Sequence, residues 1–257
     1  IVENILRNME TDTPGQSIFM NNYDNVTHLL QELNQWKQDS SIITQAGRVL
    51  DLRTGFGLWA MYFADNNPDC EVFGVDFVYM QPSSVPPNCE FHIIDLTRSN
   101  WWEMYTDISL VHINDLGGDI SLLRCLLAGA FKCSMPCGVV ELHGITFDLY
   151  NQKSWLYGFY KSLRAAYWKD GRRLDLPNRI PLMVEYSSDL QKRFLKTWFD
   201  GLEALALDLM TKHLGWTHET ILLKCALARG ELLKGTHGYL TIWNVYGSRP
   251  NINLQGL

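Results

Sequence analysis

A short apolar segment followed by a glycine-containing turn and a helix constrains the fold of this chain most strongly. Residues 48–52 (RVLDL) predict a buried strand, the turn RTGFG (53–57) ends it, and LWAMYFA predicts a helix. A second strand, EVFGVDF (71–77), follows after a short polar loop. Strand, turn, helix and strand in this order predict the βαβ unit of a parallel sheet.

The same alternation continues to about residue 145. Further strands are predicted at 90–95 and 107–113, a helix at 121–134 and another strand at 138–145. This repetition predicts an α/β fold with a doubly wound, mostly parallel sheet. Such a sheet binds ligands at the carboxyl ends of its strands.

Helical patterns flank this sheet in the sequence. Residues 16–38 place apolar side chains at helical spacing, and aromatic helices follow residue 150, before a closing strand at 238–247. No linker separates these parts, so we expect one domain over 1–257 with an N-terminal helical lid (1–40) and a helical cap (150–215) that covers the substrate.

Composition restricts the class of partner. The 22 basic and 28 acidic residues give a net charge of −6, which argues against nucleic acid as a partner. With 46% hydrophobic residues and no run of membrane-spanning length or targeting segment, we expect a soluble, cytoplasmic protein. The six cysteines include no Cys-x-x-Cys pair, so no metal site or disulfide framework is expected.

The turn and the second strand carry the strongest functional signal. Asp51 precedes glycines at 55 and 57, and Asp76 lies 19 residues beyond Gly57. Small residues let the backbone pass close to a ligand, and an acidic side chain at about this spacing accepts hydrogen bonds from ribose hydroxyls. The pattern therefore predicts a nucleoside cofactor.

Several segments resemble one enzyme family. VLDLRTGFGLWAMYFADNNPDCEVFGVDF resembles the cofactor motif of class I S-adenosylmethionine methyltransferases, specifically their fungal LaeA-like branch. QPSSVPPNCEFHIIDL, CGVVELHG, GWTHET and HGYLTIWNVYGSRP are similar to the same branch, so that the likeness spans most of residues 23–250. The resemblance implies a Rossmann-like methyltransferase fold with a sheet of the seven-stranded type, and bound S-adenosylmethionine or S-adenosylhomocysteine.

The resemblance also implies roles for individual residues. Asp51, Gly55 and Gly57 would line the methionine and adenosine moieties, and Asp76 would hold the ribose. Phe77 would stack beside the adenine, which Asp95 and Leu96 would flank, and Asn114 would face the transferred methyl group. The alternatives are that Asp51 caps turn amides and that Asp95 and Asn114 are ordinary loop residues.

Arg53 departs from the family pattern, which has its first motif glycine at this position. Its side chain would project towards the methionine carboxylate or the sulfonium. Arg53 would then either pair with that carboxylate or fill the pocket and abolish normal cofactor use. A solvent-directed Arg53 without a role is the third alternative.

Two residues near the end of the fifth strand are candidates for a catalytic base. Strand alternation places Glu141 and His143 on one face, and an ordinary histidine exchanges protons near neutral pH. A structural histidine is the alternative for His143. His112, inside the fourth strand, is expected in the core, and His237 is expected to be structural at least as readily as catalytic.

Aromatic side chains would suit a flat, apolar metabolite, with packing in the core as their alternative. The candidates for substrate binding are Trp101, Trp102, Trp155, Tyr160 and Trp168.

The leading functional hypothesis is an O-methyltransferase acting on a secondary metabolite. A methyltransferase-like cyclase or pericyclase that transfers no methyl group is the alternative that Arg53 favours, and a LaeA-like regulatory protein is the third. The partner expected is a small apolar molecule, without nucleic acid or membrane, and a homodimer is compatible with the sequence. Residues 174–190 leave little room for a helix, turn and strand that the family has there.

Overall fold

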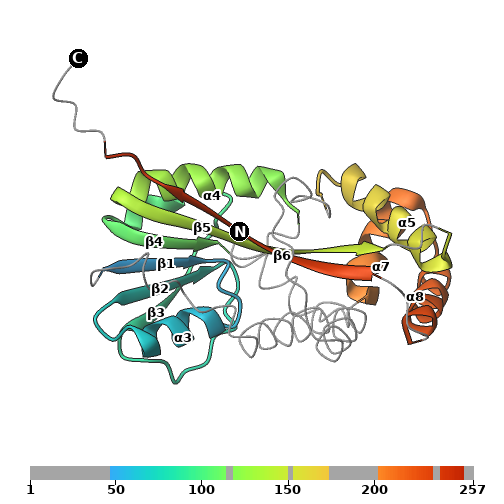
Figure 1. Ribbon diagram of the computed structural model, residues 1–257, viewed down its shortest axis with the longest axis horizontal. Helices are drawn as coiled ribbons and strands as arrows, with labels where there is room; N and C mark the ends of the chain where they lie inside the picture. The colour runs from blue at the N-terminus through green and yellow to red at the C-terminus, as the bar shows by residue number, and fades with distance from the viewer. Residues whose placement is uncertain (1–46, 114–117, 150–152, 174–201, 234–237, 252–257) are drawn as a thin grey trace, which may run out of the picture. The chain divides into compact units, whose positions relative to one another are not determined.

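The computed structural model describes residues 47–113, 118–149, 153–173, 202–233 and 238–251, which form two compact units (Figure 1). Among the described residues, the sheet unit contains 47–113, 118–146, 172–173 and 241–251. The helical unit contains 147–149, 153–171, 202–233 and 238–240. The expected lid (1–40) and the segment 174–190 lie outside the described residues.

The described strands form one sheet in the order β3-β2-β1-β4-β5-β6. The pairings from β3 across to β5 are all parallel. This order is that of a doubly wound Rossmann-like sheet, so the predicted α/β fold class is confirmed. The strands are β1 (Arg48–Leu52), β2 (Glu71–Asp76), β3 (Cys89–Ile93), β4 (Ile108–Ile113), β5 (Ser134–Leu149) and β6 (Gly238–Ser248).

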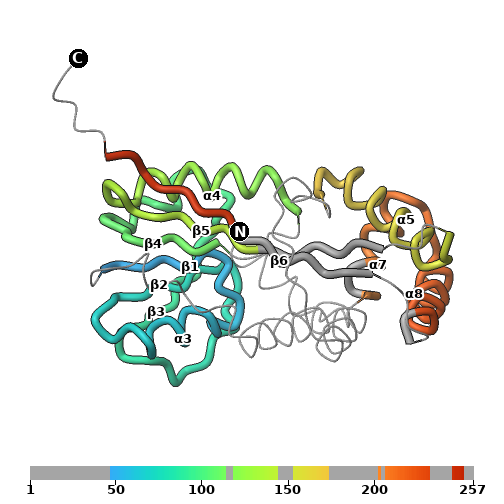
Figure 2. Tube along the Cα trace, viewed as in Figure 1, coloured from blue at the N-terminus to red at the C-terminus, as the bar shows by residue number. Residues whose placement is uncertain are grey.

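Helices cover both faces of this sheet, as the ribbon and the Cα trace show (Figures 1 and 2). Helix α3 (Leu58–Asn66) lies on one face, and α4 (Ile120–Cys133) lies on the other beside the short 3₁₀ helix η1 (Trp101–Met104). Because β1 and β4 are covered on both faces, nearly all of their residues are buried.

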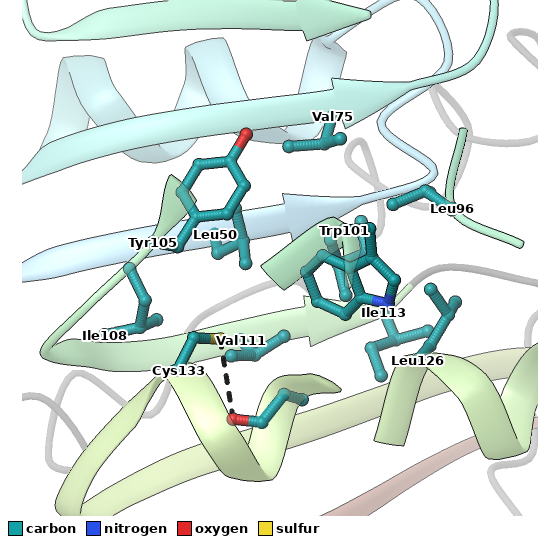
Figure 3. Close-up of a cluster of buried hydrophobic side chains, with 12 residues drawn as sticks. Leu50, Val75, Leu96, Trp101, Tyr105, Ile108, Val111, Ile113, Leu126 and Cys133 are labelled. Carbon is teal, nitrogen blue, oxygen red and sulfur yellow. Dashed lines mark hydrogen bonds between the residues drawn. The ribbon is translucent and has the colours of Figure 1, made fainter. Parts of the chain in front are cut away.

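The core on the α4 face contains aliphatic residues of the central strands and of α4 (Figure 3). Leu50 and Val111, which are register partners on β1 and β4, pack there with Leu126 of α4 and with Trp101. A Cβ atom on Gly129 would lie 2.3 Å from Cζ2 of Trp101, so glycine is required at this helical position for the indole to pack. This core holds the strand ends that carry the candidate site.

The helical unit contains α5 (Trp155–Lys169), α7 (Leu202–Leu214) and α8 (His218–Leu233). The amino end of α5 is capped twice: Ser154 accepts a hydrogen bond from the Tyr157 amide, and Glu231 of α8 accepts from the Leu156 amide at 2.6 Å. Arg229 of α8 binds Glu203 of α7 through both guanidinium NH groups. Because α8 ends at Leu233, the helices extend beyond residue 215, where the predicted cap ends.

Within the part of the chain that the structure describes, no helix is long and apolar enough to span a bilayer. The same residues contain no cluster of three or more histidine, cysteine or acidic side chains suited to a metal ion.

Candidate functional site

The loop between β1 and α3 turns through three residues with left-handed backbone conformation. These are Arg53 (φ 59°), Gly55 (φ 57°) and Gly57 (φ 78°). The amide of Gly57 donates to the Thr54 carbonyl at 2.9 Å, which closes the turn at the start of α3. Glycine adopts a positive φ without penalty, but Arg53 does so against its own preference.

Asp76 ends β2 directly beneath this loop. Its Oδ2 accepts a hydrogen bond from the Gly55 amide at 3.0 Å, and its Oδ1 accepts from the Phe77 amide at 2.7 Å and from the Val78 amide at 3.4 Å. Burial raises the pKa of Asp76 above its usual value, while the Gly55 amide and the charge of Arg53 oppose that rise. The loop and the carboxylate are therefore one hydrogen-bonded assembly.

Gln81 binds the other backbone polar group of Gly55. Its buried side-chain amide donates to the Gly55 carbonyl at 2.5 Å. The NH and CO groups of Gly55 are thus both hydrogen-bonded, one to Asp76 at the end of β2 and one to Gln81, which follows that strand.

Asp51 lies beneath the loop with no exposed surface. Its Oδ2 accepts from the Thr54 hydroxyl at 2.6 Å, and its Oδ1 lies 2.9 Å from Nδ1 of His112. In this structure both oxygens of Asp51 bind protein groups, and direct contact with a ligand, which the resemblance implies, stays a prediction. The alternative was a carboxylate that caps turn amides, whereas the hydrogen bonds of Asp51 described here are to the side chains of Thr54 and His112.

A row of polar side chains crosses the sheet on its α3 face. Asp51, His112 and Glu141 are register partners on β1, β4 and β5. The indole of Trp59, from α3, stacks on the His112 imidazole with ring centroids 3.9 Å apart and planes 2° from parallel. His112 is in the core, as expected, and there it binds the Asp51 carboxylate of β1.

His143 lies two residues beyond Glu141 and is buried. Its ring centroid is 6.4 Å from that of His112. Desolvation, reinforced by the charge of His112, lowers the pKa of His143 from 6.5 to about 3. This pKa is lower than the near-neutral value expected for His143, so the imidazole is neutral at neutral pH, and its role as a base stays a prediction.

Glu141 has a different environment on the same strand. It is partly exposed, and the Tyr246 hydroxyl of β6 donates to its Oε1 at 3.1 Å. Of the two candidate bases, Glu141 is thus the one with access to solvent.

The carboxyl ends of β2 and β3 expose apolar surface next to Asp76. Phe77 is 48% exposed, and Ile93, the register partner of Asp76, is 54% exposed. Asp95 instead binds within its own turn, where it accepts from the Thr97 hydroxyl at 2.6 Å. That hydrogen bond lowers the pKa of Asp95. Leu96 is buried in the core cluster, so its side chain packs there.

The five aromatic candidates for substrate binding have different environments. Trp101 belongs to the core, which was its alternative, and Trp102 is partly buried with Lys132 4.7 Å above its ring. In the helical unit, Tyr160 is buried, whereas Trp155 and Trp168 are exposed. Substrate contact by the last two stays a prediction, and Asn114 lies outside the described residues.

Sequence reasoning missed several residues that shape the site. Phe91 of β3 fills the space over two glycines, because a Cβ on Gly57 would lie 2.2 Å from its ring and one on Gly74 would lie 2.4 Å from it. Gln81 and Trp59 were also missed as partners of the loop. The advance signal was the apolar alternation of β3, which contains Phe91.

The curated relatives include regulators and a methyltransferase. Secondary metabolism regulator laeA of Fusarium oxysporum f. sp. lycopersici is 32% identical over 247 residues, which cover 79% of this chain and 76% of that protein. Methyltransferase pytC of Aspergillus terreus is 24% identical over 216 residues, covering 72% of this chain and 66% of that protein. No family model matches the chain.

Similar solved structures include two enzymes at low identity. Coclaurine N-methyltransferase bound to N-methylheliamine and SAH has a TM-score of 0.49 and 16% identity, and the match covers 87% of this chain and 72% of that one. The [4+2]-cyclase SpnF has a TM-score of 0.47 and 15% identity, with 85% and 80% covered.

Membership follows from the relative at 32% identity, whose match covers more than three quarters of both chains. The parallel sheet order and the βαβ unit with Asp76 at the end of β2 agree with it. This protein belongs to the LaeA-like family of class I S-adenosylmethionine-dependent methyltransferases.

Proposed function

We propose that this protein binds S-adenosylmethionine at the carboxyl ends of β1 and β2 and transfers its methyl group to an oxygen of a small secondary metabolite. The observation that carries the proposal is the buried Asp76 carboxylate, which is tied to the glycine loop through the Gly55 amide. An acidic group at the end of the second strand is the ribose partner of nucleoside cofactors in doubly wound sheets.

The residues present fit such a cofactor. The two Asp76 oxygens accept three backbone hydrogen bonds, and a carboxylate offers about four lone-pair sites, so acceptor capacity remains for a hydroxyl. Phe77 and Ile93 supply the exposed apolar surface that a nucleobase would cover. We assign Asp76 to the ribose, Phe77 to the adenine, and the Gly55–Gly57 loop to the rest of the nucleoside.

When bound, the cofactor supplies an electrophilic methyl group. Transfer to a hydroxyl requires alignment of that oxygen and an acceptor for its proton. We propose Glu141 as the acceptor, because it is partly exposed, whereas His143 is buried and neutral. The Tyr246 hydroxyl then orients the Glu141 carboxylate.

Product analysis tests the reaction. The protein is incubated with S-adenosylmethionine carrying a labelled methyl group and with a panel of phenolic and hydroxylated metabolites. The proposal expects S-adenosylhomocysteine to form in step with a product that is heavier by one methyl group. Binding of the cofactor without any methylated product would contradict the proposed reaction while leaving the binding site intact.

A second candidate function is a cyclisation that uses the fold without methyl transfer, and Arg53 is the observation that favours it. Arg53 replaces the first motif glycine, adopts φ 59° and interacts electrostatically with Asp76. In the same incubation, a cyclase would consume its substrate with no mass gain and no S-adenosylhomocysteine. A regulatory role, suggested by the names of the laeA relatives, predicts neither product.

A further inference from the structure

We call the β1–α3 connection (residues 53–57) the cofactor loop. Asp51 and His112 beneath it and Thr54 within it form a buried hydrogen-bonded clamp, which we define as these three side chains. Thr54 Oγ1 lies 2.6 Å from one Asp51 oxygen, and His112 Nδ1 lies 2.9 Å from the other. The side chains of Asp51 and His112 are 1% and 2% exposed. Because a carboxylate only accepts, both partners donate, and His112 carries its proton on Nδ1.

The clamp fixes the chain before and after Arg53, at Asp51 and at Thr54. Asp51 belongs to β1, and Thr54 is held through its side chain by Asp51 and through its amide by the Val75 carbonyl at 3.1 Å. The backbone at Arg53 must close the gap between these fixed points, and it does so at φ 59°. This conformation is unfavourable for any residue with a Cβ atom.

We propose that the clamp holds Arg53 in its left-handed conformation, and that His112 is the positioning residue on which the cofactor loop depends. His112 is fixed by its stacking on Trp59 and holds Asp51, which holds Thr54. One residue further, the Gly55 amide reaches Asp76. The clamp thereby makes up for the glycine that is absent at position 53. Its effect on cofactor affinity rests on the proposed function, whereas its effect on the loop does not.

The clamp makes a specific prediction about coupling between positions 53 and 112. A glycine at position 53 adopts a positive φ without strain, so the loop would keep its conformation with a weakened clamp. Loss of the His112 donor must therefore be more harmful in the presence of Arg53 than in the Arg53→Gly variant. A merely structural histidine would destabilise both backgrounds equally.

Two variants of His112 separate its hydrogen bond from its packing. His112→Phe keeps a ring to stack on Trp59 but removes the donor to Asp51, whereas His112→Asn keeps an amide donor near the position of Nδ1. His213→Phe is the matched control, because it breaks a second histidine–aspartate contact, 2.8 Å to Asp170, in the helical unit. Each variant is made with Arg53 and with Arg53→Gly.

Two measurements are read on every variant: affinity for S-adenosylhomocysteine by calorimetric titration, and hydrogen exchange of the Gly55 and Gly57 amides. We expect His112→Phe to weaken binding about ten-fold or more and to speed exchange of both amides. In the Arg53→Gly background, the loss should shrink to about three-fold or less. His112→Asn should restore most of the affinity, and His213→Phe should leave both measurements unchanged.

The outcomes distinguish this inference from the proposed function. Equal effects of His112→Phe in both backgrounds, or unchanged amide exchange in a folded variant, would overturn the clamp. A wild type that does not bind S-adenosylhomocysteine would refute the proposed function. Exchange of the Gly55 and Gly57 amides, compared between the two backgrounds, would still test the clamp. If His112→Phe does not fold, Thr54→Val removes the other donor with little change in shape, and Thr54→Ser is its control.

Discussion

His112 and Asp51, which are 61 residues apart in the sequence, meet beneath the cofactor loop, with Nδ1 of the imidazole 2.9 Å from a carboxylate oxygen. Both side chains are buried, and they occupy register-matched positions on adjacent strands β4 and β1. The hydrogen bond links the centre of the sheet to the turn that presents the Gly55 amide to Asp76. The site therefore depends on strand pairing as well as on its local motif.

The first prediction concerns the pH dependence of cofactor binding. Burial raises the pKa of Asp76, so this carboxylate becomes protonated at a higher pH than an ordinary aspartate. Protonation removes an acceptor for ribose hydroxyls, and affinity for S-adenosylhomocysteine should fall as the pH drops through that raised pKa. Calorimetric titrations at several values from about pH 8 down to the lowest pH at which the protein stays folded measure this fall. Affinity that stays constant in a folded protein below pH 3.8, the ordinary aspartate pKa, would contradict the role of Asp76.

Arg53 is expected to shift the pH at which this affinity is lost. Its positive charge favours the ionised form of Asp76, so Arg53→Gly should raise the pKa of Asp76 further and move the loss of binding to a higher pH. At pH 8 the affinity should hold or improve, because strain at φ 59° is relieved. The same titrations measure both effects. Weaker binding at every pH would show instead that Arg53 pairs with the carboxylate of the ligand.

His143 should make the fold sensitive to acid. Its pKa is about 3 in the fold against 6.5 without burial, so between these values the unfolded chain binds a proton that the folded chain does not. Stability is therefore lost as the pH falls below 6.5, at a slope of up to about 1.4 kcal/mol per pH unit. Urea unfolding at pH 7.5 and pH 5.5 should show that His143→Gln loses about 1 kcal/mol less than wild type.

The control for His143 is His218→Gln, an exposed histidine at the start of α8, which should follow wild type. The same low pKa predicts that His143→Gln retains turnover close to wild type once folded. A drop in turnover of roughly 10² with unchanged cofactor affinity would restore His143 as the base.

A substitution of Gly129 tests how tightly Trp101 packs against α4. A Cβ atom there would lie 2.3 Å from Cζ2 of Trp101, so Gly129→Ala should lower the free energy of unfolding by about 1–3 kcal/mol. Gly158→Ala is the matched control, because this glycine of α5 has no neighbouring atom within 4 Å of an added Cβ. That variant should gain about 0.5–1 kcal/mol from its helix. Equal effects of the two substitutions in denaturant unfolding would refute the tight packing of Trp101.

The sequence predicts the parts of this structure that depend on neighbouring residues. Apolar runs, the glycine turn and the spacing to Asp76 are local signals, and they locate β1, α3, β2 and the acidic residue at the strand end. The contact of Trp101 with Gly129 depends on how η1 packs against α4, and the contacts of Phe91 with Gly57 and Gly74 depend on which strands pair and in what register. Periodicity does not encode such pairings.

The same limit explains why the sequence did not predict the low pKa of His143. The pKa of His143 depends on burial and on the nearby His112, 31 residues earlier in the chain, and neither is visible in the alternation of β5. Asp51 was correctly placed beside the loop from its position after an apolar strand. Its hydrogen bond to Thr54 became clear only with the conformation of the turn, and its contact with His112 only with the pairing of β1 and β4.

Titration of the folded protein with S-adenosylhomocysteine tests the central claim most directly. Wild type should bind, and Asp76→Asn should weaken binding about ten-fold or more, because an amide replaces a buried carboxylate acceptor. Asp69→Asn, which removes the same charge from an exposed loop before β2, should bind like wild type. A folded wild type without measurable binding, or equal affinities for wild type and Asp76→Asn, would contradict the assignment of the cofactor site to the end of β2.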